Sequence, residues 1–144
     1  MRKTAIFTFI LALVSCGLNQ NPPSYMKEVV AYKEGSDGLV AYFILADGSG
    51  AMTTGNGSVT IKITEETSTG RERQLYSRTI TVSNSNFYKT KVGRGAFEHD
   101  AILCSFGRIT YSSFVLKPSE SMGKIKIEFT GNGKVMSGED TIFW

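Results

Sequence analysis

The sequence predicts an all-β protein built as a single β-sandwich of about seven to nine strands. Three observations predict this fold. Apolar and polar residues alternate along most of the chain, glycine-rich turn signals separate the alternating segments, and no stretch has the periodicity of a long amphipathic helix. A length of 144 residues suits one domain with one core. A small closed β-barrel, which leaves the same pattern of short strands, is the alternative.

The first expected strands differ in how they meet the core. Residues 26–33 (MKEVVAYK) are mixed in polarity, which is typical of an edge strand. Residues 39–45 (LVAYFIL) are apolar throughout and fit a central strand. In residues 59–64 (VTIKIT) every second residue is apolar, so one face meets the core and the other meets water.

The later part of the chain repeats this pattern. Residues 124–129 (KIKIEF) alternate most regularly. Asn-Gly and Asp-Gly pairs, which tolerate the positive φ of tight hairpins, lie between the strands and account for much of the glycine content. The remaining expected strands are 75–82, 87–92, 101–106, 109–116 and 134–143, and a single turn is expected at 84–87.

The N-terminus has the pattern of an export signal. Arg2 and Lys3 precede eleven residues without a charge, 4–14. A bilayer-spanning helix needs about 20 apolar residues, so a secretory signal is favoured over a membrane anchor. Leu13-Val14-Ser15-Cys16 then resembles the lipobox of bacterial lipoproteins.

This resemblance implies that the Cys16 thiol receives a diacylglyceryl group and that cleavage frees its amine. Two or three acyl chains anchor a protein stably in a membrane. The expected organisation is a signal peptide at 1–15, a lipidated flexible tether at 16–25 and a β-sandwich domain at 26–144. The expected location is the bacterial cell envelope, on the outer membrane in a diderm organism. An ordinary secretory signal or a buried N-terminal strand is the alternative.

The run from Tyr42 to Phe87 carries a second resemblance. It contains YFILADGSG (42–50), GNGSVTIKI (55–63) and LYSRTITVSNSNF (75–87). These segments resemble the immunoglobulin-like and fibronectin type III-like modules of prokaryotic surface proteins. The resemblance implies an immunoglobulin-like sandwich, and it implies no particular reaction.

Few residues suggest chemistry. The one histidine, His99, is expected on the surface, and Cys104 is expected in the core as a small apolar residue. The acidic pairs Glu65-Glu66 and Glu139-Asp140 are expected in solvated turns. No phosphate-binding loop, EF-hand or zinc spacing is present, so no cofactor and no metal are expected.

A modest basic patch near aromatic residues is the candidate binding surface. Its expected members are Lys89, Lys91, Arg94, Arg108 and Tyr88. Without Arg2 and Lys3, 14 basic residues face 13 acidic ones, so a nucleic-acid partner is not expected. The patch is either a solvated strand face or a site for an acidic glycan or a phospholipid headgroup.

These observations favour a lipid-anchored envelope protein that binds or scaffolds without catalysis. Apart from the membrane, its expected partner is another envelope protein, contacted through loops or through an edge strand at either end of the domain. An accessory lipoprotein of an envelope assembly or transport complex is the second hypothesis. A small hydrolase using His99 is the third.

Overall fold

The computed structural model describes residues 20–144, so Leu13, Val14, Ser15 and Cys16 lie outside the described residues. Nine strands and three single-turn 3₁₀ helices follow one another. The strands are β1 (Tyr25–Lys33), β2 (Gly38–Ala46), β3 (Met52–Thr53), β4 (Gly57–Glu66), β5 (Glu72–Val82), β6 (Phe87–Val92), β7 (His99–Thr110), β8 (Met122–Gly131) and β9 (Lys134–Phe143), and the 3₁₀ turns are η1 (Asn84–Asn86), η2 (Gly95–Phe97) and η3 (Tyr111–Ser113).

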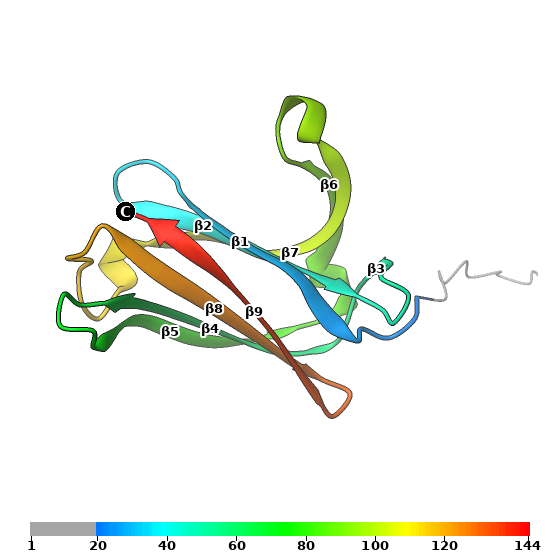
Figure 1. Ribbon diagram of the computed structural model, residues 1–144. Helices are drawn as coiled ribbons and strands as arrows, with labels where there is room; N and C mark the ends of the chain where they lie inside the picture. The colour runs from blue at the N-terminus through cyan, green and yellow to red at the C-terminus, as the bar shows by residue number, and fades with distance from the viewer. Residues whose placement is uncertain (1–19) are drawn as a thin grey trace, which may run out of the picture.

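The strands form two antiparallel sheets that pack face to face as a β-sandwich (Figure 1). One sheet has the order β1-β2-β7-β6, with the short β3 also paired to β2, and the other has the order β5-β4-β8-β9. Leaving β3 aside, this is the strand order of an immunoglobulin-like sandwich with one additional strand in the second sheet. The sheets do not close on themselves, so the sandwich prediction is confirmed and the barrel alternative is wrong.

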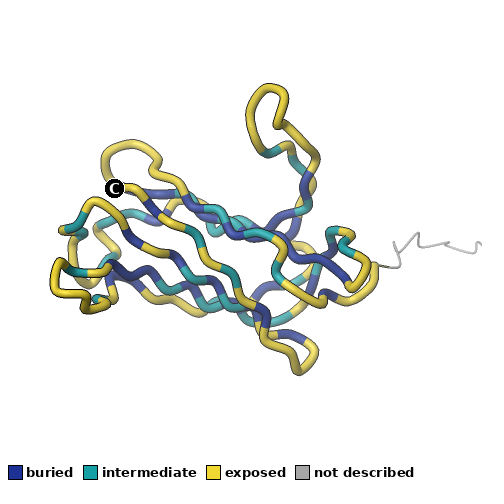
Figure 2. Tube along the Cα trace, viewed as in Figure 1, coloured by how far each residue is buried: buried dark blue, intermediate teal, exposed yellow. Residues whose placement is uncertain are grey.

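The core lies between the sheets and follows the alternation of the sequence. In β8, Ile125, Ile127 and Phe129 are fully buried, while Lys126 and Glu128 between them lie on the outer face and pair with each other. Phe43 of β2 packs against Phe129 across the two layers, with ring centroids 6.3 Å apart. Cys104 is buried in the same cluster, as expected. Figure 2 shows the buried positions recurring along each strand.

The prediction of a separate strand at residues 109–116 is wrong. Residues 101–106 belong to a longer strand, β7, whereas 109–116 do not form a strand of their own. A bulge in the pairing of β2 with β7 adds a residue to β7, and Gly107 adopts a φ of 65° there, so the strand continues to Thr110. The chain then turns at η3, where Tyr111 packs against Phe114 and Trp144.

Glu65 is also not where it was expected. Its side chain is fully buried at the end of β4, whereas Glu66 beside it is exposed. The carboxylate accepts hydrogen bonds from the backbone N–H groups of Ser119 (3.1 Å) and Glu120 (3.2 Å) and forms an ion pair with Arg73. It therefore fixes the long connection between β7 and β8 to the end of the sandwich.

Residues 20–24 lie on the domain, although the sequence assigned them to a tether. The Ser24 N–H donates to the Ala46 carbonyl (2.8 Å), and the Asn21 amide donates to Asp47 Oδ2 (3.0 Å). The hydroxyl of Thr53 donates to the Asn21 carbonyl (2.6 Å). The domain therefore extends further toward the N-terminus than the boundary at residue 26.

Both strands that were expected at edges are edge strands. β1 and β9 each pair with one neighbour, but they also lie side by side at one border of the sandwich. The Ala31 N–H donates to Asp140 Oδ2 (2.8 Å), so Asp140 is not a freely solvated turn residue. This border is therefore covered by the protein itself, whereas β5 and β6 have no second strand partner among the described residues.

The expected turn at Asn132-Gly133 is confirmed. These residues have φ angles of 51° and 71°, as a two-residue hairpin between β8 and β9 requires. Gly55 and Gly57, by contrast, do not have positive φ. Those two glycines are needed for space, because a side chain at either position would collide with the ring of Phe129.

Candidate functional site

A hairpin projects from the sandwich and gives this protein its most distinctive surface. β7 pairs with β2 only as far as Cys104, and the preceding residues 99–103 pair with β6 alone. The two strands curve away from the first sheet and end in the η2 turn (Figure 1). We call residues 88–100 the arm.

A small second core holds the base of the arm. Ile44, Ala101 and Leu103 are buried together on the outer face of the first sheet, with Val92 and Met52 packed against them. The Ile102 N–H lies 3.4 Å from the sulfur of Met52. Because this cluster is buried, the curvature of the arm is fixed at its base and the exposed part is its outer end (Figure 2).

The arm collects four of the five residues of the expected basic patch. Tyr88, Lys89 and Lys91 lie on β6, and Arg94 lies in the turn at the tip. Arg108 does not join them, because it lies near the other end of β7 and forms an ion pair with Asp37. The patch is therefore smaller than the sequence predicted.

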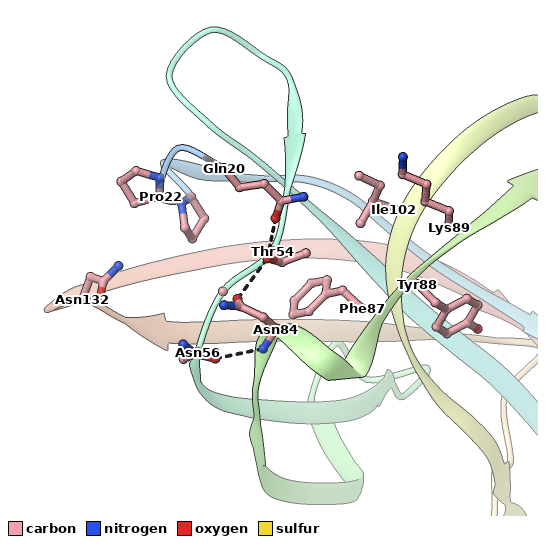
Figure 3. Close-up of a pocket in the computed structure, with 12 residues that line it drawn as sticks. Gln20, Pro22, Thr54, Asn56, Asn84, Phe87, Tyr88, Lys89, Ile102 and Asn132 are labelled. Carbon is pink, nitrogen blue, oxygen red and sulfur yellow. Dashed lines mark hydrogen bonds between the residues drawn. The ribbon is translucent and has the colours of Figure 1, made fainter. Parts of the chain in front are cut away.

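A cleft of about 600 Å³ opens where the arm joins the sandwich (Figure 3). We call it the arm cleft. The N-terminal segment, the connection between β3 and β4, the η1 turn and the base of the arm form its walls. Its lining residues are Gln20, Pro22, Pro23, Thr54, Gly55, Asn56, Asn84, Phe87, Tyr88, Lys89, Ile102 and Asn132.

The polar groups of the arm cleft are held in place by hydrogen bonds. Asn56 Oδ1 accepts from the Asn84 backbone N–H (2.8 Å), which leaves the amide nitrogen of Asn56 available as a donor. The Thr54 hydroxyl lies 2.6 Å from Gln20 Oε1 and 2.9 Å from Asn84 Oδ1 and links these two side chains (Figure 3). Amides fixed in this way recognise ligands that carry several hydroxyl or carbonyl groups.

Charge and apolar surface complete the arm cleft. The ammonium group of Lys89 supplies a positive charge at its rim, and Ile102 and the edge of Phe87 supply a small apolar surface, whereas the ring of Tyr88 points away from the amides (Figure 3). A cation, several amides and a small apolar surface together suit an anionic ligand with a polar edge and an apolar face.

The sequence did not single out the amides of the arm cleft. Gln20, Asn56, Asn84 and Asn132 come from four separate segments, and each asparagine looks like an ordinary turn residue. The available signal was that several turns on one end of a sandwich all carry amides. Using this signal requires the strand order, because the order decides which turns share an end.

The two candidate reactive residues are placed apart. His99 is exposed on the arm, where Nδ1 lies 3.1 Å from the Phe97 carbonyl. Cys104 lies in the core, and burial raises the pKa of its thiol to about 11. The thiol is therefore protonated at neutral pH and shielded from reagents.

Between residues 20 and 144, no three His, Cys, Asp or Glu side chains lie close enough together to hold a metal ion. Within the same residues, no helix has the length and apolarity needed to cross a bilayer. Comparisons of the chain with protein-family models, with curated proteins and with solved structures find no match.

Proposed function

We propose that this protein is a lipoprotein of the bacterial cell envelope, anchored through Cys16, and that its immunoglobulin-like domain is a non-catalytic binding module. The lipobox residues Leu13, Val14 and Ser15 support the anchor. The hydrogen bonds of residues 21–24 to the domain support a short connection, because few residues then separate Cys16 from the sandwich. The domain would sit close to the membrane surface.

The arm cleft is the observation that carries the binding function. Its fixed amides match the hydroxyl groups of a saccharide, and the apolar surface of Ile102 and the edge of Phe87 match the apolar face of a sugar ring. Lys89 adds a preference for negative charge. We therefore propose an acidic glycan as the ligand of the arm cleft.

The anchor is tested by mass spectrometry of the mature protein. We expect a chain that begins at Cys16 and carries the mass of a diacylglyceryl group, because acylation of the thiol precedes cleavage of a lipoprotein signal. In Cys16→Ser both the added mass and this cleavage should be lost. Cys104→Ser is the matched control and should keep both, since Cys104 is buried. A wild-type chain without acyl mass would contradict the proposal.

The ligand class is tested by titrating the mature protein with a uronic-acid trisaccharide and a neutral trisaccharide. Wild type should bind the acidic sugar more tightly. Lys89→Ala should weaken that binding by at least about tenfold, because a charge-assisted hydrogen bond is lost, and should leave the neutral sugar unaffected.

Lys33→Ala is the matched control for this experiment. It removes the same charge from an exposed lysine at the far end of β1. Equal losses in the two variants would show a general charge effect. That result, or the absence of binding to both sugars, would overturn the assignment of an acidic glycan to the arm cleft.

A further inference from the structure

We propose that the tip of the arm, residues 93–98, inserts into the interfacial region of the bilayer that holds the lipid anchor. This inference rests on the proposed anchoring through Cys16, and it adds a second membrane contact. The tip would then fix the orientation of the domain, which an anchor alone does not fix.

Phe97 projects into solvent at the tip of the arm. Its side chain is 84% exposed, more than any other large hydrophobic side chain of the described residues. Hydrogen bonds from the Phe97 N–H to the Arg94 carbonyl and from the Glu98 N–H to the Gly95 carbonyl, both 3.1 Å, shape the turn. An aromatic ring is therefore presented to solvent on a defined turn, and the small residue Ala96 lies beside it.

The charges near the Phe97 ring also suit a lipid surface. Glu98 is paired with Lys91 at 3.4 Å, whereas Arg94 forms no ion pair with any described residue. A free guanidinium beside an exposed aromatic ring matches a membrane interface, where the cation meets lipid phosphates and the ring lies at the level of the headgroups. The tip therefore fits a phospholipid surface.

The tip of the arm and the lipid anchor are able to reach the same membrane surface. Gln20 and Lys89 line the same cleft, so the N-terminal segment enters the domain beside the base of the arm. The four residues that follow Cys16, up to Gln20, span at most about 14 Å when extended. The strand from Lys89 to Gly93 extends by about 13 Å. A membrane plane that contains the acyl chains can therefore also contain the tip.

The anchor and the tip reinforce one another. Burial of one phenylalanine does not hold a soluble protein on a membrane by itself. The lipid anchor, however, keeps the tip at a high effective concentration near the bilayer, so insertion becomes an intramolecular step. A modest favourable free energy of inserting the Phe97 ring is then enough to fix the orientation of the domain.

The test uses the full acylated protein in vesicles of phosphatidylcholine and phosphatidylglycerol. Ala96→Cys, labelled with the fluorophore NBD, reports on the tip while Phe97 stays in place. Val115→Cys is the matched control, because it is 74% exposed and lies outside the arm in the connection after η3. The native Cys104 should not take up the label, since it is buried.

We expect a blue-shifted emission for the label at residue 96 and a reduction by aqueous dithionite about tenfold slower than at residue 115. Adding Phe97→Ser should abolish both differences. If the acylated protein floats with the vesicles but the two labels behave alike, the insertion is overturned while the anchor stands. If both differences persist in Phe97→Ser, the ring does not drive insertion and the inference is equally overturned. Failure of the protein to float would instead refute the proposed anchoring.

Discussion

Phe129→Ala should lower the free energy of unfolding by about 3–5 kcal/mol. Phe129 is fully buried between the two sheets, beside Phe43. Truncation to alanine removes the apolar contacts of the ring and leaves a cavity. The size of the loss depends on how far the neighbouring residues close that cavity.

Three glycines line one edge of the Phe129 ring, and this explains why the cavity should persist there. A methyl group added to Gly55 would lie 2.8 Å from the ring atom Cζ, and one added to Gly131 would lie 2.6 Å from Cε1. A methyl group added to Gly57 would lie 3.1 Å from the same Cζ atom. Glycines have no side chains that move into the vacated space, so the loss should fall toward the upper end of the range.

Urea unfolding measures this effect as a lower midpoint with an unchanged slope. Phe143→Ala is the matched control, because Phe143 is 65% exposed and lies at the end of β9. Its substitution should change the stability by less than about 0.5 kcal/mol. Similar losses in the two variants would contradict this account of the core.

Glu65→Ala should lower the free energy of unfolding by about 3 kcal/mol. The variant leaves the N–H groups of Ser119 and Glu120 without their acceptor and removes the ion-pair partner of Arg73. Glu65→Gln should lower the free energy of unfolding by less, because its one remaining oxygen still accepts a hydrogen bond. It should still destabilise the protein, because the amide nitrogen faces other donors. Glu66→Ala, which removes an exposed carboxylate next to it, should change the stability by less than about 0.5 kcal/mol.

The same carboxylate makes stability depend on pH. Burial raises the pKa of Glu65, but the hydrogen bonds from Ser119, Arg73 and Glu120 outweigh burial and lower the pKa overall. This stabilisation is therefore fully present above the pKa of an unfolded glutamate, about 4.3, and it is lost as the pH falls through the lower folded value. Below pH ~4.3 the free energy of unfolding should fall more steeply for wild type than for Glu65→Gln. If urea unfolding gave parallel curves of stability against pH for the two proteins, the role of Glu65 would be contradicted.

Asp47 adds to this loss in acid. The side-chain hydrogen bonds from Ser49 and Asn21, together with the backbone N–H groups of Ser49 and Ala51, lower its pKa to about 2. The stability that ionised Asp47 contributes is therefore also lost as the pH falls. Asp47 is present in both wild type and Glu65→Gln, so the difference between their two curves isolates the effect of Glu65.

Alternation predicted the strands well, since each face of a sheet selects one kind of residue. The expected bounds of β6 and β9 coincide with those observed. Alternation did not distinguish residues 109–116 from a strand, because Ile109 and Tyr111 alternate with polar residues and an apolar stretch follows at 114–116. Their side chains pack on Trp144 instead of extending a sheet.

The burial of Glu65 was missed because the general tendency of carboxylates was given more weight than the local alternation. It lies two residues after Ile63, so the period of two places both on the inner face. The general tendency of carboxylates to remain exposed suggested the opposite. The deciding partners, Ser119 and Glu120, are more than 50 residues away in the sequence, where pattern analysis does not reach.

The candidate site was predicted only in part for the same reason. Lys89 and Lys91 are close in sequence and stay close in space, whereas Arg108 is separated from them by the length of β7. The arm itself depends on the cluster around Ile44 and Leu103, which lies outside the main core. Such a second core forms only when the strands of the sheet are assembled, so the alternation within single segments did not predict it.

The attachment of residues 20–24 beside β1 also has a mechanical consequence. Residue 20 and Trp144 lie at opposite ends of the sandwich (Figure 1). A pulling force applied between these two ends therefore acts along the strands. The hydrogen bonds between β1 and β2 run across that direction, so they bear the load together in shear and are not opened one after another.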